Sequence, residues 1–203
     1  SLKKLIAGAC SAVIMLTSVN LTVFSAGNEE FTSFIDDFES VQTGTLPAEY
    51  IANYTDGNIS VENYNGDNVL SVEKSGDGQL SIVTRNFPAL TDTGVEVSFD
   101  FMQNSVKIDG TTVFALCNSG EELVKLETYN GNISFKNSLG GYTTVVENYL
   151  ANKWYSFTAD IDLLSGEVSI SLGGNTILRR VPFTSAGNSC DSVSFSTKYS
   201  PGF

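Results

Sequence analysis

The sequence predicts an all-β protein, built as a two-sheet antiparallel β-sandwich. Two observations favour this fold class. Apolar and polar residues alternate with a period of two over most of the chain after residue 30, and short clusters of Gly, Asn, Asp and Ser interrupt the alternation. No segment of this region shows the 3.6-residue period of an amphipathic helix. Many short strands in a single domain of this length imply two packed sheets.

The alternation is clearest in residues 93–103, 153–162 and 167–172, where one strand face is apolar and the other mainly polar. Asn130-Gly131 lies between two β-prone runs and predicts a hairpin, because a type I′ turn needs positive φ at both central residues. The predicted strands are 31–38, 58–63, 68–74, 79–87, 93–103, 111–117, 122–129, 132–136, 142–149, 153–162, 167–172, 176–182 and 192–197.

Composition excludes several classes of function. The chain has 203 residues with 23 acidic and 11 basic side chains, a formal charge of -12. Nucleic acid and anionic membrane surfaces are therefore unfavourable partners, since both are bound through clustered Lys and Arg. The sequence contains no histidine, which excludes a Ser-His-Asp triad, a Cys-His dyad and any His-ligated metal. Carboxylates, Tyr, Lys and Arg remain for chemistry.

The first 27 residues have the pattern of a signal peptide. Lys3 and Lys4 precede an apolar run over 5–24, and the small residues of 25–27 offer a cleavage site. The alternative is an uncleaved membrane anchor, since the run is about long enough to span a bilayer. We expect a secreted, extracellular protein of bacterial type, whose residues 28–203 form a single β-sandwich domain.

The expected mature domain keeps two cysteines, Cys117 and Cys190. An oxidising compartment permits a disulfide between them. The alternative is a pair of buried free thiols, because Cys117 lies in an apolar predicted strand.

Three local patterns, taken in order, resemble the concanavalin A-like lectin/glucanase (laminin G-like) jelly-roll modules of secreted bacterial glycan-active proteins. They are the opening run 34–40 with Gly44 and 46–47 after it, the strand-turn-strand run 123–135, and the run 153–173. The resemblance implies a jelly roll and a place in a glycan-binding or glycan-degrading protein. Modules of this kind end in a further strand paired with the opening one, so we expect the missing last strand, and a catalytic domain after it, beyond residue 203.

Catalytic members of this superfamily carry a Glu-x-Asp-x-Glu strand, and the sequence lacks it. The nearest run, 96–100, has Ser98 where the central acid belongs. Asp160 and Asp162 have the spacing of a carboxylate pair, but Asp162 adjoins a turn, where Asp commonly binds the backbone. Lys125 with Glu127 is the candidate base and carboxylate of a lyase. The sequence thus favours a non-catalytic module.

Sugar sites on β-sandwiches combine aromatic rings, which contact C–H faces, with polar groups that bind hydroxyls. If their strands are neighbours in one sheet, six residues line such a groove: Lys125, Glu127, Tyr129, Tyr142, Trp154 and Asp160. The alternative for each aromatic residue is ordinary packing, and for each charge a solvated face.

Asp36, Asp37 and Glu39 suggest a structural calcium site, since jelly rolls of the resembled family hold calcium near the opening strand and calcium prefers several oxygen ligands. The alternative is an edge strand protected by charge.

The leading hypothesis is a non-catalytic carbohydrate-binding module of a secreted plant-polysaccharide-degrading protein, with a polysaccharide or oligosaccharide as its partner. One alternative is a polysaccharide lyase or glycoside hydrolase. A second is an extracellular adhesion module with a protein partner.

Overall fold

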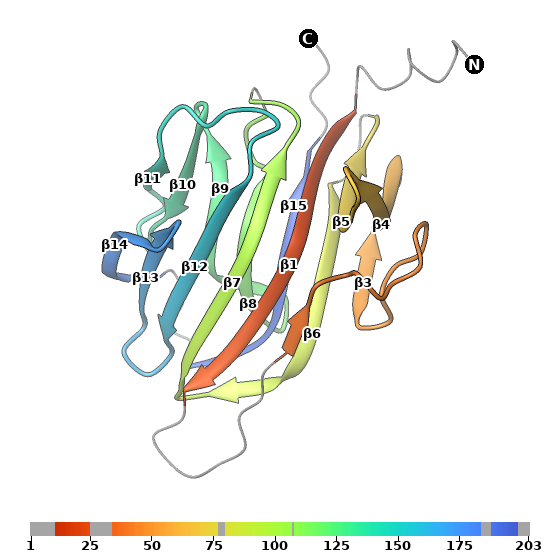
Figure 1. Cartoon of the computed structure of the whole chain (residues 1–203). Coiled ribbons are helices and arrows are strands. Elements are labelled where there is room, and N and C mark those ends of the chain that lie inside the picture. Colours follow the sequence, from red (N-terminus) through yellow and green to blue (C-terminus); the bar gives the residue numbers. More distant parts are fainter. Residues whose placement is uncertain (1–10, 25–33, 77–79, 107, 184–187, 199–203) are drawn as a thin grey trace, which may run out of the picture.

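Two antiparallel sheets lie face to face in the computed structural model, which describes residues 11–24, 34–76, 80–106, 108–183 and 188–198 (Figure 1). The front sheet has the order β14 (Asn175–Pro182), β13 (Glu167–Leu172), β12 (Tyr155–Asp162), β7 (Gly94–Gln103), β1 (Ala12–Phe24), β5 (Asp67–Lys74), β4 (Gly57–Tyr64), and β2 (Phe34–Asp36) also pairs with β1. The back sheet has the order β11 (Tyr142–Val146), β10 (Asn132–Lys136), β9 (Glu121–Tyr129), β8 (Thr112–Asn118), β15 (Ser189–Thr197), β6 (Ser81–Thr91), β3 (Tyr50–Asn53). The described residues include no helix. The predicted all-β sandwich is confirmed.

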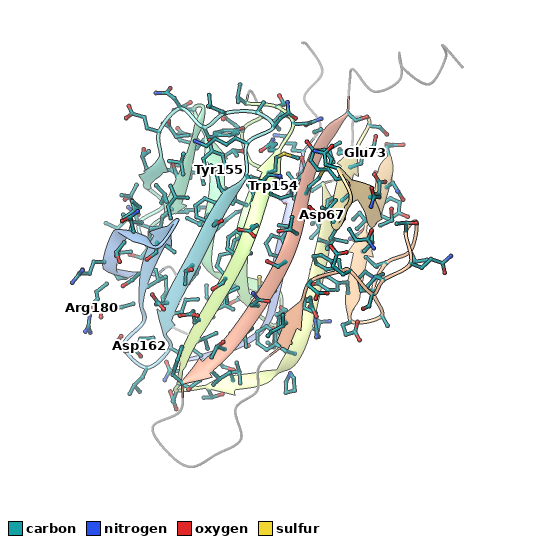
Figure 2. All side chains as sticks on the ribbon, viewed as in Figure 1. Asp67, Glu73, Trp154, Tyr155, Asp162 and Arg180 are labelled. Carbon is teal, nitrogen blue, oxygen red and sulfur yellow. The ribbon has the colours of Figure 1, made fainter. Side chains whose placement is uncertain are left out.

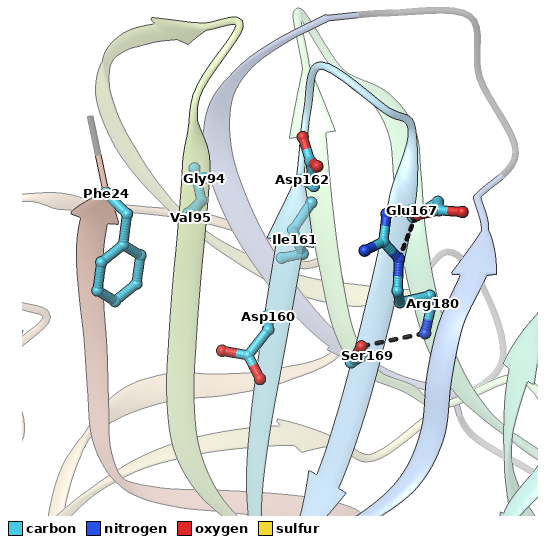
Figure 3. Close-up of a pocket in the computed structure, with 9 residues that line it drawn as sticks. All are labelled: Phe24, Gly94, Val95, Asp160, Ile161, Asp162, Glu167, Ser169 and Arg180. Atoms are coloured by element: carbon cyan, nitrogen blue, oxygen red, sulfur yellow. Dashed lines mark hydrogen bonds and ion pairs between the residues drawn. The ribbon is translucent and has the colours of Figure 1, made fainter. Parts of the chain in front are cut away.

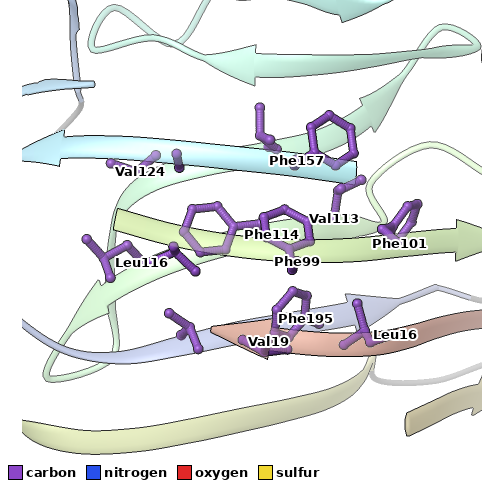
Figure 4. Packing of buried hydrophobic residues seen from close by; sticks show 14 of the residues in the cluster. Leu16, Val19, Phe99, Phe101, Val113, Phe114, Leu116, Val124, Phe157 and Phe195 are labelled. Atoms are coloured by element: carbon purple, nitrogen blue, oxygen red, sulfur yellow. The ribbon is translucent and has the colours of Figure 1, made fainter. Parts of the chain in front are cut away.

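Apolar side chains from both sheets meet in one core (Figure 4). Phe99 of β7 lies at its centre. Its ring stacks on Phe157 of β12 at 5.4 Å and reaches across to Phe114 of β8 at 5.1 Å and Phe195 of β15 at 5.6 Å. These residues occupy the apolar positions of alternating strands, so the same alternation places polar residues on the two outer faces.

Every predicted strand overlaps an observed one, and the first, predicted over 31–38, overlaps β2 within the described residues. The hairpin at Asn130-Gly131 is confirmed, with φ of 50° and 75° at its central residues. Two strands were not predicted. They are β3, which is short, and β1, which was assigned to the signal peptide.

β1 is an interior strand of the front sheet. It pairs with β5 on one side and with β7 on the other, both antiparallel. Ile14, Leu16, Val19 and Leu21 point into the core and are fully buried. A bulge between Leu16 and Val19 adds one residue relative to β7 and keeps both halves of the strand in the same orientation. In the unprocessed chain, the apolar run of the predicted signal peptide therefore serves as a core strand.

The other features of that prediction, Lys3, Lys4 and residues 25–27, lie outside the described residues. Within the described part of the chain, no helix has the length and hydrophobicity needed to cross a bilayer.

Both described cysteines are buried free thiols, on β8 and β15. Of the two alternatives for this pair, the structure has the second. Burial raises the pKa of Cys190 to about 12, with a further contribution from Asp191. The thiol therefore stays protonated at neutral pH and packs as a small apolar side chain.

Candidate functional site

The outward face of the front sheet carries a continuous strip of polar side chains. Strand pairing, together with a hydrogen bond from Thr17 to Asp100 in the third row, places them in three rows. All are exposed or half-buried: Thr22, Glu96, Asp160 and Ser169; Asn20, Ser98, Thr158 and Ser171; Thr17, Asp100 and Ser156. Their strand neighbours are the apolar residues of the core, so the strip is the polar half of a regular alternation. It presents hydroxyl, carboxamide and carboxylate groups side by side over four strands.

Two contacts join polar side chains of the strip, and one of its acceptors lies buried. Thr17 donates to Asp100 Oδ2 at 3.1 Å, and the hydroxyl groups of Ser98 and Thr158 lie 3.5 Å apart. The Oδ1 atom of Asn20 is buried and has no hydrogen-bond partner among the described residues. A buried acceptor of this kind is commonly satisfied by an ordered water molecule.

Glu96 and Asp160 are directly opposite one another on β7 and β12. Burial raises the pKa of Glu96, and the charge of Asp160 and a hydrogen bond between the two groups raise it further. This is the arrangement of two carboxylates that share a proton as the pH falls. No group of three or more His, Cys, Asp or Glu residues in the described ranges is placed to hold a metal ion.

A pocket of about 210 Å³ opens at one end of the strip (Figure 3). Phe24 and Asp160 line one side. The other side is formed by Glu167 and Arg180, whose Nε and Nη2 atoms lie 2.8 and 2.6 Å from Glu167 Oε2. The pocket therefore combines an aromatic ring, carboxylates and a guanidinium group.

Arg180 is held in its position by the backbone. Its φ of 49° lies in the left-handed region, which a non-glycine residue adopts at a cost of about 1 kcal/mol or more. The backbone N–H of Arg180 donates to Ser169 Oγ at 3.1 Å, next to irregularities in the β13–β14 register. The strain sits beside the pocket, where it aims the side chain at the Glu167 carboxylate.

Asp162, a second acid of the pocket, is engaged in the turn after β12. Its Oδ1 atom accepts hydrogen bonds from the backbone N–H groups of Leu164 and Ser165, both at 3.0 Å. The Ser165 contacts lower the pKa of Asp162. The interpretation of Asp162 as a turn residue therefore agrees with the structure, and of these two acids Asp160 is the one that belongs to the strip.

Aromatic side chains lie at the opposite end of the strip, where Figure 2 shows Trp154 far from Asp162. Trp154 precedes β12 and Tyr64 ends β4, and their rings meet at 6.3 Å across the strands that separate them. Ser71 and Met102, both paired with Met15 on the outward face, are nevertheless buried. From Trp154 to Asp162 the strip is about 26 Å long, at the rise of an antiparallel strand.

The remaining predicted binding residues form a separate cluster on the back sheet. Tyr129 and Tyr142 stack with centroids 4.0 Å apart and an interplanar angle of 11°. The Tyr142 hydroxyl donates to Glu127 Oε1 at 2.5 Å, and Lys125 Nζ lies 3.1 Å from Glu127 Oε2. The predicted single groove is therefore wrong in its geometry, because Trp154 and Asp160 belong to the other sheet.

The environment of Lys125 disfavours a role as a lyase base. Burial alone lowers its pKa, but ion pairs with Glu122 and Glu127 outweigh burial, and the net pKa is raised. A general base needs a pKa lowered toward neutrality. Lys125 instead remains charged between its two carboxylates.

The three acids predicted to hold calcium make separate contacts. Asp36 Oδ2 accepts from Arg85 at 3.0 Å and from the Tyr50 hydroxyl at 2.9 Å. Asp37 caps the turn through the Glu39 backbone N–H, and the Glu39 side chain binds the Asn68 backbone N–H. These carboxylates anchor the β2 region, and calcium binding remains a prediction.

Comparison with known proteins gives a likeness at the level of the fold. No family model and no curated protein matches the sequence. A solved structure described as a sialidase aligns with a TM-score of 0.67 at 17% identity, over 80% of this chain and 14% of the sialidase chain. The full extracellular region of zebrafish Gpr126/Adgrg6 aligns with a TM-score of 0.37 at 10% identity, over 96% of this chain and 29% of that chain. The sialidase likeness shows a β-sandwich. This chain spans a small part of both proteins.

Sequence reasoning missed the Glu96–Asp160 pair and the Arg180–Glu167 pair. The alternation of each strand shows that these residues face outward, but β7 and β12 are far apart in the sequence, and their register follows only from the fold. For Arg180 and Glu167 a signal was present, because β13 and β14 are consecutive strands joined by the short Gly173-Gly174 turn.

Proposed function

We propose that the chain is a non-catalytic carbohydrate-binding module that binds a polysaccharide along the polar strip of the front sheet. The observation that carries this proposal is the arrangement of the strip, in which hydroxyl, carboxamide and carboxylate groups lie between aromatic residues at both ends. Polar groups of this kind bind sugar hydroxyls, and rings such as Trp154 and Phe24 contact the apolar faces of sugars.

The charge of the strip favours a neutral glycan. Glu96, Asp100 and Asp160 lie along it, and Arg180 at the pocket is already paired with Glu167. A polyuronate or other anionic glycan brings like charges to these carboxylates, which costs binding free energy. Xylans, β-glucans and mannans therefore suit the strip better than pectins.

The fold supports the same class of function by analogy only. The sialidase that aligns with the chain is by its description a glycan-active protein, and modules that bind glycans are frequent parts of such proteins. Lys3, Lys4 and the apolar run over 5–24 support an extracellular site of action. The proposed site belongs to the chain that keeps this run, because β1 supplies part of the strip and Phe24 lines the pocket.

The test is affinity electrophoresis against neutral and anionic polysaccharides, followed by titration calorimetry with the best ligand. Trp154→Ala and Asp160→Ala should each weaken binding about tenfold, which corresponds to about 1.4 kcal/mol. Tyr129→Ala on the back sheet is the matched control and should bind like the parent. Retardation by no polysaccharide, or loss of binding in the control alone, would refute the proposal.

The Glu96–Asp160 pair supports a second candidate, hydrolysis of a glycoside. A carboxyl group with a raised pKa beside an ionised carboxylate is the pattern of a general acid and its partner. Release of reducing ends by the parent chain, abolished in Glu96→Gln, would establish an enzyme. Binding without release would leave the module non-catalytic.

A further inference from the structure

The polar strip changes character toward the start of β1. Beyond the row that contains Thr17, the next outward row across β7, β1 and β5 consists of Met102, Met15 and Ser71. The strand neighbours of these three residues belong to the core between the sheets, so alternation places the three on the outer face. The outer face is therefore mainly apolar at this row.

This end of the outer face is also buried. Met102 is 2% exposed and Ser71 is 3% exposed, whereas the rows of the strip are exposed or half-buried. Val69, the next outward residue of β5, is fully buried as well. Neither Val69 nor Met102 belongs to the core cluster between the sheets. Side chains on the outer face must therefore cover them.

Tyr64 and Trp154 are the side chains in position to do so. Trp154 precedes β12 and Tyr64 ends β4, and the sheet order places β7, β1 and β5 between those two strands. Four strand spacings of about 4.8 Å separate the backbones of β12 and β4 by about 19 Å. The two ring centroids are nevertheless only 6.3 Å apart, in an edge-to-face contact at 73°. Both side chains therefore extend toward one another over the strands between them.

On the basis of the proposed function above, we propose that Tyr64 and Trp154 form an aromatic bridge that closes this end of the strip, so that the strip receives the terminus of a glycan chain. A chain that lies along the strip meets the bridge after the row of Thr17. It cannot continue, because side chains already fill the next row. The terminal sugar therefore lies against Trp154.

The opposite end of the strip is open. Phe24 is 53% exposed, and Asp160 beside the same pocket is exposed. Arg180 contacts Glu167 on the neighbouring strand and does not reach across to Phe24 (Figure 3). Within the described part of the chain, no ring contact or ion pair joins the two walls of the pocket. The rest of the polymer can leave the strip at this end.

The last polar row before the bridge has the chemistry to recognise a terminus. A terminal sugar carries a free hydroxyl group where an internal sugar has a glycosidic oxygen, which has no proton to donate. Asp100 lies in this row, accepts a hydrogen bond from Thr17 through Oδ2 and is paired with the exposed Ser156. An ionised carboxylate only accepts hydrogen bonds, so Asp100 favours the free hydroxyl group. A site that binds a hydroxyl group in this way discriminates strongly against a ligand that lacks it.

The number of chain ends tests this inference. The unbranched xylan, β-glucan or mannan that retards the 203-residue chain most is divided in two, and one half is shortened by limited acid hydrolysis. Titration calorimetry then gives the number of binding sites per gram in each half. This number should rise in proportion to the reducing ends. Equal numbers would overturn the inference and leave the proposed function intact, whereas retardation by no polysaccharide would remove both.

A variant of the bridge gives a second readout. Tyr64→Ala removes one ring and opens the end of the strip while Trp154 remains, so the uncut polysaccharide should offer this variant more sites per gram than the parent. Tyr54→Ala is the matched control, because Tyr54 is exposed and has no ring contact among the described residues. It should count the same sites as the parent. Equal counts for a folded Tyr64→Ala and the parent would overturn the bridge; if circular dichroism shows that Tyr64→Ala does not fold, the hydrolysis experiment decides.

Discussion

The role of β1 leads to a sharp prediction for Leu21→Ala. Leu21 is fully buried, lies opposite Val97 of β7 and belongs to the core between the sheets. Substitution removes the side chain beyond Cβ at a place where strands on both sides restrict collapse of the cavity. In the unprocessed chain, Leu21→Ala should therefore destabilise the fold by about 2–5 kcal/mol, the range measured for buried leucines.

The matched control is Thr22→Ala, one residue along on the outward face, where the change should stay within about 0.5 kcal/mol. For a chain of this length, 1 kcal/mol shifts the unfolding temperature by about 2–4 °C. The expected loss for Leu21→Ala is thus roughly 4–20 °C.

The assay is urea unfolding of the unprocessed 203-residue chain, followed by fluorescence of Trp154 and by circular dichroism. Equal stability of Leu21→Ala and the parent would show that residues 12–24 do not occupy the core in solution. The account of the front sheet would then be wrong.

Three further predictions concern single side chains. The folded state raises the pKa of Glu96, so the native protein loses stability as pH rises through that pKa. Glu96→Gln should therefore be more stable than the parent at pH 7 by roughly 0.2–1 kcal/mol. In thermal unfolding this difference should vanish below about pH 4. Tyr142→Phe removes the hydrogen bond to Glu127 and should cost about 1 kcal/mol in urea unfolding, more than Tyr129→Phe. With its pKa raised to about 12, Cys190 should resist a disulfide-exchange reagent at pH 8 in the native protein and react once urea unfolds it. Rapid reaction before unfolding would contradict the burial of this thiol.

Much of the fold follows from local pattern. Strands such as β7 and β12 alternate cleanly because one face meets the other sheet and the other meets solvent, and this is visible in the sequence without knowledge of their partners. The hairpin at Asn130-Gly131 follows from turn geometry alone. β1 could not be found in this way, because an apolar run after two lysines has the same composition as a leader and as a buried strand.

The site was predicted less well than the fold. Residue type pointed to aromatic and acidic side chains, and the cluster of Tyr129, Tyr142 and Glu127 does form. The assignment of Trp154 and Asp160 to the same groove failed, since the choice of sheet for each strand depends on long-range pairing. Contacts between strands distant in sequence are set by the packing of the whole core and leave no local signal.

The most direct test of the central claim is a map of backbone amide shifts by NMR during titration with a neutral polysaccharide. Binding along the polar strip should perturb residues 96–100 and 156–160, together with the indole N–H of Trp154, and leave 125–129 unchanged. Perturbation confined to 125–129 and 142, or no perturbation at saturating ligand, would contradict a carbohydrate site on the front sheet.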